Sequence, residues 1–209
     1  MFENRQDAGK KLAAALEKYK NKGVLVLALP KGGIGVAFEV AKYLNADFSL
    51  MIVRKLPFPD NPEGGFGAIA EDGSIYINQE SSCYLSKNEI KDIILFQKDE
   101  IKRRITLLRK GKPLPELRDK TVILIDDGIA AGSTMRAAIM LCKKQKVKKI
   151  VVAVPVAGRE VAEQIKKLAD KIIVLEMPPF FRAVAQVYKN WYDVSDKEAL
   201  KIIAKNNRQ

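Results

Sequence analysis

The sequence predicts an α/β protein with a doubly wound, mainly parallel sheet and a small region near its carboxyl end. Short apolar runs that suit buried strands alternate with segments in which apolar residues recur at helical spacing. This alternation is typical of parallel sheets, because a crossover between parallel strands usually contains a helix. With 209 residues, 47% of them apolar, the chain is long enough for one well-buried domain.

The first part of the chain supplies two of the expected parallel strands. In order, the pattern predicts a helix at 5–21, a strand at 24–28, a helix at 36–44, a strand at 49–54 and a short strand at 75–77. Residues 56–73 hold three prolines and four glycines, so we expect an irregular, mobile loop between the last two strands.

The second part begins with a capping box, Ser86-Lys87-Asn88-Glu89, that starts a helix reaching about Lys110. The later elements expected are a strand at 122–125, a helix at 134–143, strands at 150–154 and 172–175 with a helix at 161–168 between them, and a last helix after the capping box at 195–198. We find no internal repeat and no linker, and therefore predict a single domain over residues 1–209.

Two neighbouring acids follow the strand at 122–125, in the stretch V-I-L-I-D-D-G-I-A-A-G-S-T. Ligands of such sheets bind at the carboxyl ends of the strands, where Asp126 and Asp127 lie. Two like charges side by side repel each other, and the strand end offers them no obvious partner. We therefore expect the compensating groups to come from outside the chain.

A loop of mostly small residues comes next and leads into a helix. Small side chains let backbone N–H groups approach an anion, and the amino end of a helix adds positive potential. This pattern predicts a phosphate site, with the carboxylates before it accepting hydrogen bonds from ribose hydroxyls. The less specific alternative is an ordinary strand-to-helix loop with an aspartate cap. The loop residues are Gly128, Ile129, Ala130, Ala131, Gly132, Ser133 and Thr134.

Residues 122–134 resemble the phosphoribosyl-diphosphate signature of type I phosphoribosyltransferases. The resemblance implies that Asp126 and Asp127 bind the 2- and 3-hydroxyls of ribose, and Mg²⁺ directly or through water, while the loop binds the 5-phosphate. Two positions depart from the family. Ala131 stands where the family commonly has threonine, and Ala130 stands where hypoxanthine-type members have an aspartate that accepts a proton from the purine.

The same resemblance assigns a diphosphate site to Lys31, Gly32 and Gly33, which follow the strand at 24–28. It also implies a cis peptide between Pro30 and Lys31. Arg54 and Lys55 end the next strand, and we expect them to add two cations to the same anionic region and to act in catalysis. Each stretch alone is a weak signal, because a cation at a strand end is often only solvated.

The family also has a mobile loop and a hood over the acceptor base. Residues 56–73 resemble the loop, and we expect the hood at about 176–194. Pro178 and Pro179 stiffen it, so that either Phe180 or Phe181 stacks on a flat ring while the other packs inward. The alternative, that both rings belong to the core, is equally compatible with the sequence.

The resemblance as a whole implies a Mg²⁺-dependent enzyme, as a homodimer, that joins an unidentified nitrogenous base to phosphoribosyl diphosphate. Two alternatives stay open: a regulator that senses phosphoribosyl diphosphate and binds nucleic acid without turnover, and a degenerate fold that binds no sugar phosphate. The net charge of +12 favours nucleic acid weakly. No aromatic residues interleave with the lysines of 98–112 and 143–149, so we prefer solvated helix faces.

Composition excludes other classes. The chain has no histidine, and its two cysteines, Cys83 and Cys142, are far apart, which argues against a disulfide framework. Residues 1–7 are charged and lack the apolar centre of a signal peptide, and no apolar run approaches membrane-spanning length. We therefore expect a cytoplasmic protein.

Overall fold

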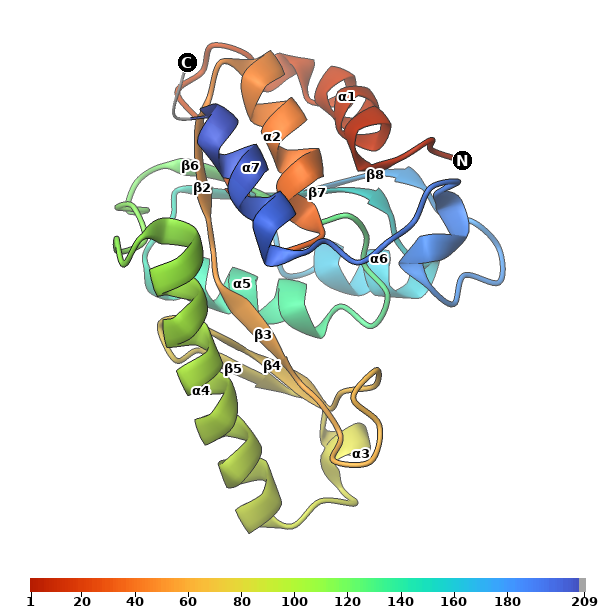
Figure 1. Ribbon diagram of the computed structural model, residues 1–209. Helices are drawn as coiled ribbons and strands as arrows, with labels where there is room; N and C mark the ends of the chain where they lie inside the picture. The colour runs from red at the N-terminus through yellow and green to blue at the C-terminus, as the bar shows by residue number, and fades with distance from the viewer. Residues whose placement is uncertain (207–209) are drawn as a thin grey trace.

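The structure, a computed structural model, describes residues 1–206 and is built around a five-stranded parallel sheet (Figure 1). The strand order is β2-β1-β6-β7-β8, and all neighbouring pairs are parallel. This confirms the predicted fold class. The strands are β1 (Leu25–Ala28), β2 (Asp47–Leu50), β6 (Thr121–Ile125), β7 (Lys149–Val156) and β8 (Lys171–Glu176).

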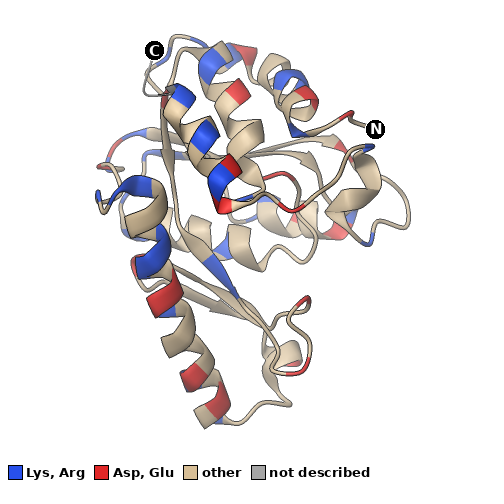
Figure 2. Cartoon of the chain, viewed as in Figure 1, with Lys and Arg blue, Asp and Glu red and all other residues tan. Residues whose placement is uncertain are grey.

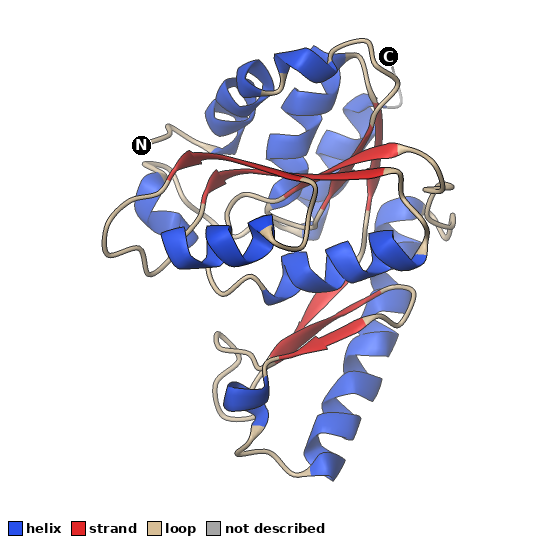
Figure 3. Cartoon of the chain, turned by 180° about the vertical axis from the view of Figure 1, so that it is seen from behind, coloured by secondary structure: helices blue, strands red, loops and turns tan. Residues whose placement is uncertain are grey.

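Helices cover both faces of this sheet (Figures 1 and 3). The helices α1 (Arg5–Ala15), α2 (Gly33–Leu44) and α7 (Asp196–Asn206) lie on one face, and α5 (Ser133–Lys144) and α6 (Arg159–Lys166) lie on the other. Strand β1 is apolar along its whole length because it is buried on both faces. Val26 packs into the hydrophobic cluster on one face of the sheet and Leu27 into the cluster on the other. A strand buried on both faces needs apolar side chains on both.

A second sheet of three antiparallel strands lies beside the first, in the order β3-β4-β5. Its strands are β3 (Val53–Leu56), β4 (Gly67–Ala70) and β5 (Ile75–Ile77), followed by the short helix α3 (Gln79–Ser82), which the sequence did not predict. The long helix α4 (Lys87–Arg109) runs along this sheet, and its amino end has the predicted Ser86–Glu89 capping box (Figure 1).

The predicted single strand at 49–54 is wrong. The chain leaves the parallel sheet after Leu50 and enters the second sheet at Val53, so this segment belongs to two strands. Met51 and Ile52, which join them, are fully buried. Because the joint is as apolar as the strands, hydrophobic periodicity does not show where one sheet ends and the other begins.

The prediction of an irregular segment throughout 56–73 is also wrong for its second half, which contains β4. The small residues of this strand suit a close approach to β5. A Cβ atom at position 67 would lie 2.2 Å from the carbonyl oxygen of Tyr76, so only glycine fits. The irregular parts are residues 57–66 and the turn at 71–73. The mobility of 57–66 stays a prediction.

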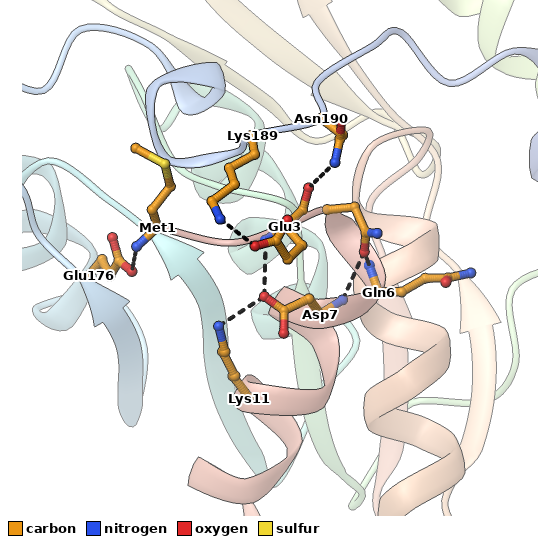
Figure 4. A network of polar contacts seen from close by, with 9 residues as sticks. Met1, Glu3, Gln6, Asp7, Lys11, Glu176, Lys189 and Asn190 are labelled. Carbon is orange, nitrogen blue, oxygen red and sulfur yellow. Dashed lines mark hydrogen bonds and ion pairs between the residues drawn. The ribbon is translucent and has the colours of Figure 1, made fainter.

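The amino-terminal residues pair with the segment at 184–190, which includes the 3₁₀ helix Val184–Val187. The N–H of Phe2 donates to the carbonyl of Val187 at 2.7 Å, and the N–H of Lys189 donates to the carbonyl of Phe2 at 2.9 Å. Side-chain contacts of Glu3 with Lys189, and of the amino terminus with Glu176, surround this pairing (Figure 4). The start of the chain therefore supports the region expected to form the hood.

The basic surface of α4 is partly neutralised by acids on the same helix (Figure 2). Lys102 pairs with Asp99 at 2.9 Å, and both Arg103 and Arg104 pair with Glu100, at 2.7 and 2.9 Å. The exposed Lys102–Asp99 pair agrees with a solvated helix face, whereas Arg104 and Glu100 are largely shielded from solvent. Among residues 1–206, no helix combines the length and the apolar character needed to cross a membrane.

Candidate active site

The two acids and the small-residue loop lie at the carboxyl end of β6. The loop is fixed to the neighbouring strand, because the N–H of Ile129 donates to the carbonyl of Val156 at 2.9 Å. Gly132 has a φ of +79°, a left-handed conformation that favours glycine, and the helix α5 begins at the next residue. This geometry directs the amino end of α5 and the backbone of the loop toward a shared space.

That space is a pocket of about 300 Å³. Asp126 and the whole loop from Gly128 to Thr134 line it, as do Lys55 and the segment 63–65. The structure therefore brings together one predicted acid, all the predicted phosphate-loop residues and one of the two predicted strand-end cations.

Asp127 faces a second pocket, of about 480 Å³, together with Lys31, Gly32 and Arg54. The expectation that Arg54 and Lys55 serve one region is wrong, because the structure gives one of them to each pocket. The reason is the strand itself, in which successive side chains point to opposite faces. Val184 borders both pockets, so its side chain marks the boundary between them.

Asp127 has partners within the chain. Its Oδ2 accepts a hydrogen bond from Nε of Arg5 at 2.8 Å, and its carbonyl oxygen accepts one from the hydroxyl of Tyr188 at 2.7 Å. The guanidinium of Arg5 is held in turn over the ring of Trp191, 4.1 Å from the ring centre, and donates to the carbonyl of Tyr192 at 2.8 Å. The expectation that the compensating groups for both acids lie outside the chain is therefore wrong for Asp127.

Burial controls the ionisation of the pair. It raises the pKa of Asp126 well above its usual range, and the neighbouring Asp127 carboxylate raises that pKa further. Burial also raises the pKa of Asp127, although Arg5 opposes this shift. Oδ1 of Asp126 accepts a hydrogen bond from the N–H of Asp127 at 2.9 Å, which fixes the orientation of the first carboxylate.

The Lys31–Gly33 segment packs directly against the acids. The peptide between Pro30 and Lys31 is cis. A Cβ atom at position 32 would lie 2.1 Å from Oδ2 of Asp127, and one at position 33 would lie 2.7 Å from the carbonyl oxygen of Ile125. Glycine is therefore required at both positions for this loop to lie so close to the end of β6.

Cations dominate the second pocket. Arg5, Lys31, Arg54 and Arg104 line it, against the acids Asp127 and Asp193. Nζ of Lys31 lies 3.2 Å from Asp196 at the start of α7, and Nε of Arg54 donates to Oε1 of Gln97 at 2.9 Å. Burial lowers the pKa of Arg54 and that of Lys55. An excess of partly buried positive charge suits a multiply charged anion.

A third pocket, of about 760 Å³, lies between the loop and the segment expected to form the hood. Ala130 and Ala131 line one side of it, and residues 177–182 line another. Phe180 is 91% exposed, whereas Phe181 packs against a cluster that includes Phe2 and Tyr188. The two rings therefore point to different environments.

The predicted Mg²⁺ site has two carboxylates from this chain. Among residues 1–206 no group of three or more histidine, cysteine, aspartate or glutamate side chains could hold a metal ion. Mg²⁺ commonly binds through one or two carboxylates and completes its coordination with water and substrate phosphates. Asp126, which lines the phosphate-loop pocket, fits this mode of binding.

Sequence reasoning missed Arg5, Tyr188 and Arg104. Arg5 lies 122 residues before its partner and Tyr188 lies 61 residues after it, so no local motif connects them to the acids. Arg104 is one of several basic residues on α4, and its sequence position gives no sign that it faces Arg54.

A parallel sheet with an acidic pair, a small-residue loop and a glycine loop at one edge defines the phosphoribosyl transferase class. Residues 2–190 match the family model described as the phosphoribosyl transferase domain, and the chain belongs to this family.

Two Mycobacterium tuberculosis proteins, both named "Putative phosphoribosyl transferase", are 36% identical over 210 residues, covering 100% of this chain and 47% of each relative. The chain thus spans about half the length of these curated relatives.

Solved structures share the fold. The protein TT1426 from Thermus thermophilus is 33% identical, with a TM-score of 0.80 over 98% of both chains. APRTase from Giardia lamblia, in complex with 9-deazaadenine, has a TM-score of 0.50 at 16% identity over 83% of this chain and 80% of that one.

Proposed function

We propose that the protein transfers the phosphoribosyl group of phosphoribosyl diphosphate to a nitrogenous base. One observation carries the proposal: Asp126 and Asp127 lie between a pocket formed by the 128–134 loop and a pocket rich in cations. A donor with a phosphate at one end, a diphosphate at the other and a ribose between them matches this order of sites.

In the proposed complex the 5-phosphate binds the backbone of the 128–134 loop and the hydroxyls of Ser133 and Thr134. The diphosphate binds Lys31 and the backbone at Gly32 and Gly33, with Arg54 beside it. Asp126 and Asp127 bind the ribose hydroxyls. Lys55 lies next to the 128–134 loop, so its ammonium group also serves the 5-phosphate.

The proposed reaction is a displacement at C1 of the ribose. A lone pair on the acceptor nitrogen forms the new bond to C1. The bond from C1 to the diphosphate oxygen breaks at the same time, and the diphosphate leaves with the electron pair of the bond that breaks. A proton carried by the nitrogen passes to solvent. Cations around the leaving group stabilise the charge that develops on it, and the two carboxylates stabilise the positive charge of the ring.

Mg²⁺ would be held by Asp126, directly or through water, together with the oxygens of the donor, and would neutralise charge on the diphosphate. The segment 57–66 would close over the site. The proposed closure is supported by the hydrogen bond from Nζ of Lys55 to the carbonyl of Glu63 at 2.6 Å, which holds this segment next to the phosphate-loop pocket. Closure would exclude water that otherwise hydrolyses the sugar.

Thermal unfolding with phosphoribosyl diphosphate and Mg²⁺ tests donor binding. A ligand of the folded state raises the melting temperature, and Thr134→Ala or Asp127→Asn should reduce the increase. Thr106→Ala, which changes an exposed threonine on α4, is the matched control and should keep the full increase. An equal increase in all four proteins would contradict the proposed site.

Diphosphate release in a screen of purines, pyrimidines and small amines tests catalysis. Release that depends on an added acceptor supports the transferase. Donor binding without release by any acceptor, together with salt-dependent binding of RNA or DNA, would instead favour the regulator. Lys102, Arg103 and Arg104 of α4 pair with acids on their own helix, which supports the transferase over the regulator. A homodimer remains part of the proposal, and sedimentation at several concentrations tests it.

A further inference from the structure

The pocket between the phosphate loop and residues 177–182 contains two arginines, Arg159 and Arg182. We propose that they select an acceptor that is a planar heterocycle bearing a carboxylate. This inference rests on the proposed transferase function, because it identifies the class of the acceptor substrate.

The backbone brings the two arginines together. A Cβ atom added at Gly158 would lie 3.4 Å from Cδ1 of Phe181, so the ring of Phe181 lies close to the backbone at Gly158. Arg159 follows the first of them and Arg182 follows the second. Phe181 is anchored in turn by the cluster that includes Phe2 and Tyr188. This proximity brings the backbones of Arg159 and Arg182 to the same pocket, which both residues line.

The turn that carries Arg182 is held by a side chain of its own segment. Oε1 of Gln186 accepts hydrogen bonds from the N–H of Arg182 at 2.6 Å and from the N–H of Ala183 at 2.8 Å. These bonds fix the backbone on either side of the arginine. Its side chain is left to interact with the contents of the pocket.

The charge of the pocket is unbalanced. Among residues 1–206, neither guanidinium group has an ion-pair or hydrogen-bond partner, and Glu160 is the one acid lining the pocket. Glu160 accepts a hydrogen bond from Gln164 of its own helix at 3.4 Å, which draws it along α6. Two guanidinium groups at one pocket favour an anion, and the planar guanidinium matches a carboxylate through paired hydrogen bonds.

The other walls suit a flat ring. Ala130 and Ala131 are small and exposed, and Phe180 presents an exposed aromatic face from the opposite segment. A heterocycle between these walls would present one face to Ala130 and Ala131 and one edge to the donor ribose. A carboxylate on its other edge would then meet Arg159 and Arg182.

Matched pairs of acceptors test this inference. Nicotinate, orotate and imidazole-4-carboxylate are each compared with the neutral carboxamide, by diphosphate release and by calorimetric binding to the protein with phosphoribosyl diphosphate and Mg²⁺. We expect at least one carboxylate to be preferred over its amide by about tenfold or more. Arg159→Gln and Arg182→Gln should each reduce that preference. The reduction should come mainly from weaker binding and slower turnover of the carboxylate, with a smaller change for the carboxamide. Arg118→Gln, at an exposed arginine that lines none of the three pockets, should change nothing.

The thermal shift with phosphoribosyl diphosphate separates the two ways of failing. If the donor raises the melting temperature but no carboxylate is preferred in binding or turnover, including the case in which no acceptor binds, this inference is wrong and the donor site stands. If the arginine variants keep the full preference, it is wrong as well. Loss of the donor shift in the unmodified protein would instead contradict the proposed function itself.

Discussion

Nε of Arg5 lies 2.8 Å from Oδ2 of Asp127, and both side chains are almost completely shielded from solvent. Arg5 belongs to α1 and Asp127 follows β6, so the pair connects the first helix to the end of a central strand. A buried ion pair of this kind adds little stability by itself, but the loss of one partner leaves an uncompensated charge.

Replacement of Arg5 by glutamine should therefore destabilise the fold by about 3 kcal/mol at pH 7, measured by urea unfolding. The loss should become smaller as the pH falls, because a proton can then neutralise Asp127. Lys10→Gln, at an exposed lysine of the same helix, is the matched control. Equal stability of the two variants would show that the Arg5–Asp127 pair is not important for the fold.

Replacement of Asp126 should have the opposite effect on stability from replacement of Arg5. Burial and the Asp127 charge raise its pKa in the folded state, so folding favours its protonated form. The corresponding contribution to stability is complete below 3.8, the ordinary pKa of an aspartate, and is lost as the pH rises through the folded-state pKa.

Asp126→Asn cannot ionise, and should raise the free energy of unfolding at pH 7 by about 1 kcal/mol while abolishing the shift with phosphoribosyl diphosphate. The gain should disappear at about pH 3. A variant that is less stable than the unmodified protein at pH 7 would contradict the raised pKa. Asp60→Asn, at an exposed position in the 57–66 segment, serves as the control.

Gly32→Ala should disrupt the proposed donor site. The added methyl group would overlap the Asp127 carboxylate, which Arg5 holds in place, so we expect a loss of about 1 to 3 kcal/mol and of the donor-induced thermal shift. At Gly35, in α2, an added Cβ would lie 3.5 Å from Cβ of Arg5, which is ordinary contact. Gly35→Ala should therefore fold normally and retain donor binding.

Phe180 and Phe181 should separate binding from stability. Phe181→Ala removes an anchored ring and should cost about 2 kcal/mol in urea unfolding. Phe180→Ala changes an exposed ring, so stability should stay within about 0.5 kcal/mol while acceptor binding weakens several-fold. If both variants lose stability and neither loses acceptor affinity, Phe180 is not part of the acceptor site.

Hydrogen exchange should divide the segment predicted as a mobile loop. Amides of 57–65 should exchange fastest among internal residues without ligand, because few of these residues pack on the core, whereas the amide of the buried Phe66 donates to the carbonyl of Leu56. The amides of β4 should be protected, since Ala68, Ile69 and Ala70 are buried in the second sheet. Slow exchange throughout 57–65, in the absence of donor, would contradict a closing loop.

Features of the site that are encoded in consecutive residues could be predicted from the sequence, whereas features that depend on residues far apart in the chain could not. The acids and the 128–134 loop were predictable because a strand, a charge change and a small-residue run occupy consecutive positions. To predict that Arg54 and Lys55 line different pockets, one must know that a strand spans exactly residues 53–56. Met51 and Ile52, which precede this strand, are apolar and buried, so the sequence does not show where the strand starts. In β4, glycine and alanine are residues that favour a loop interpretation, although Gly67 is needed for close strand pairing.

The partners of Asp127 also determine when the site can form during synthesis. Arg5 leaves the ribosome long before the acid that it binds, whereas Tyr188 and the aromatic residues that hold Arg5 leave long after it. A nascent chain that has just exposed β6 therefore has its acidic pair without the carboxyl-terminal groups that fix Arg5. Because domains fold as the chain emerges, the donor site should be one of the last parts of the protein to become competent, and ribosome-bound chains that end before residue 192 should not bind the donor.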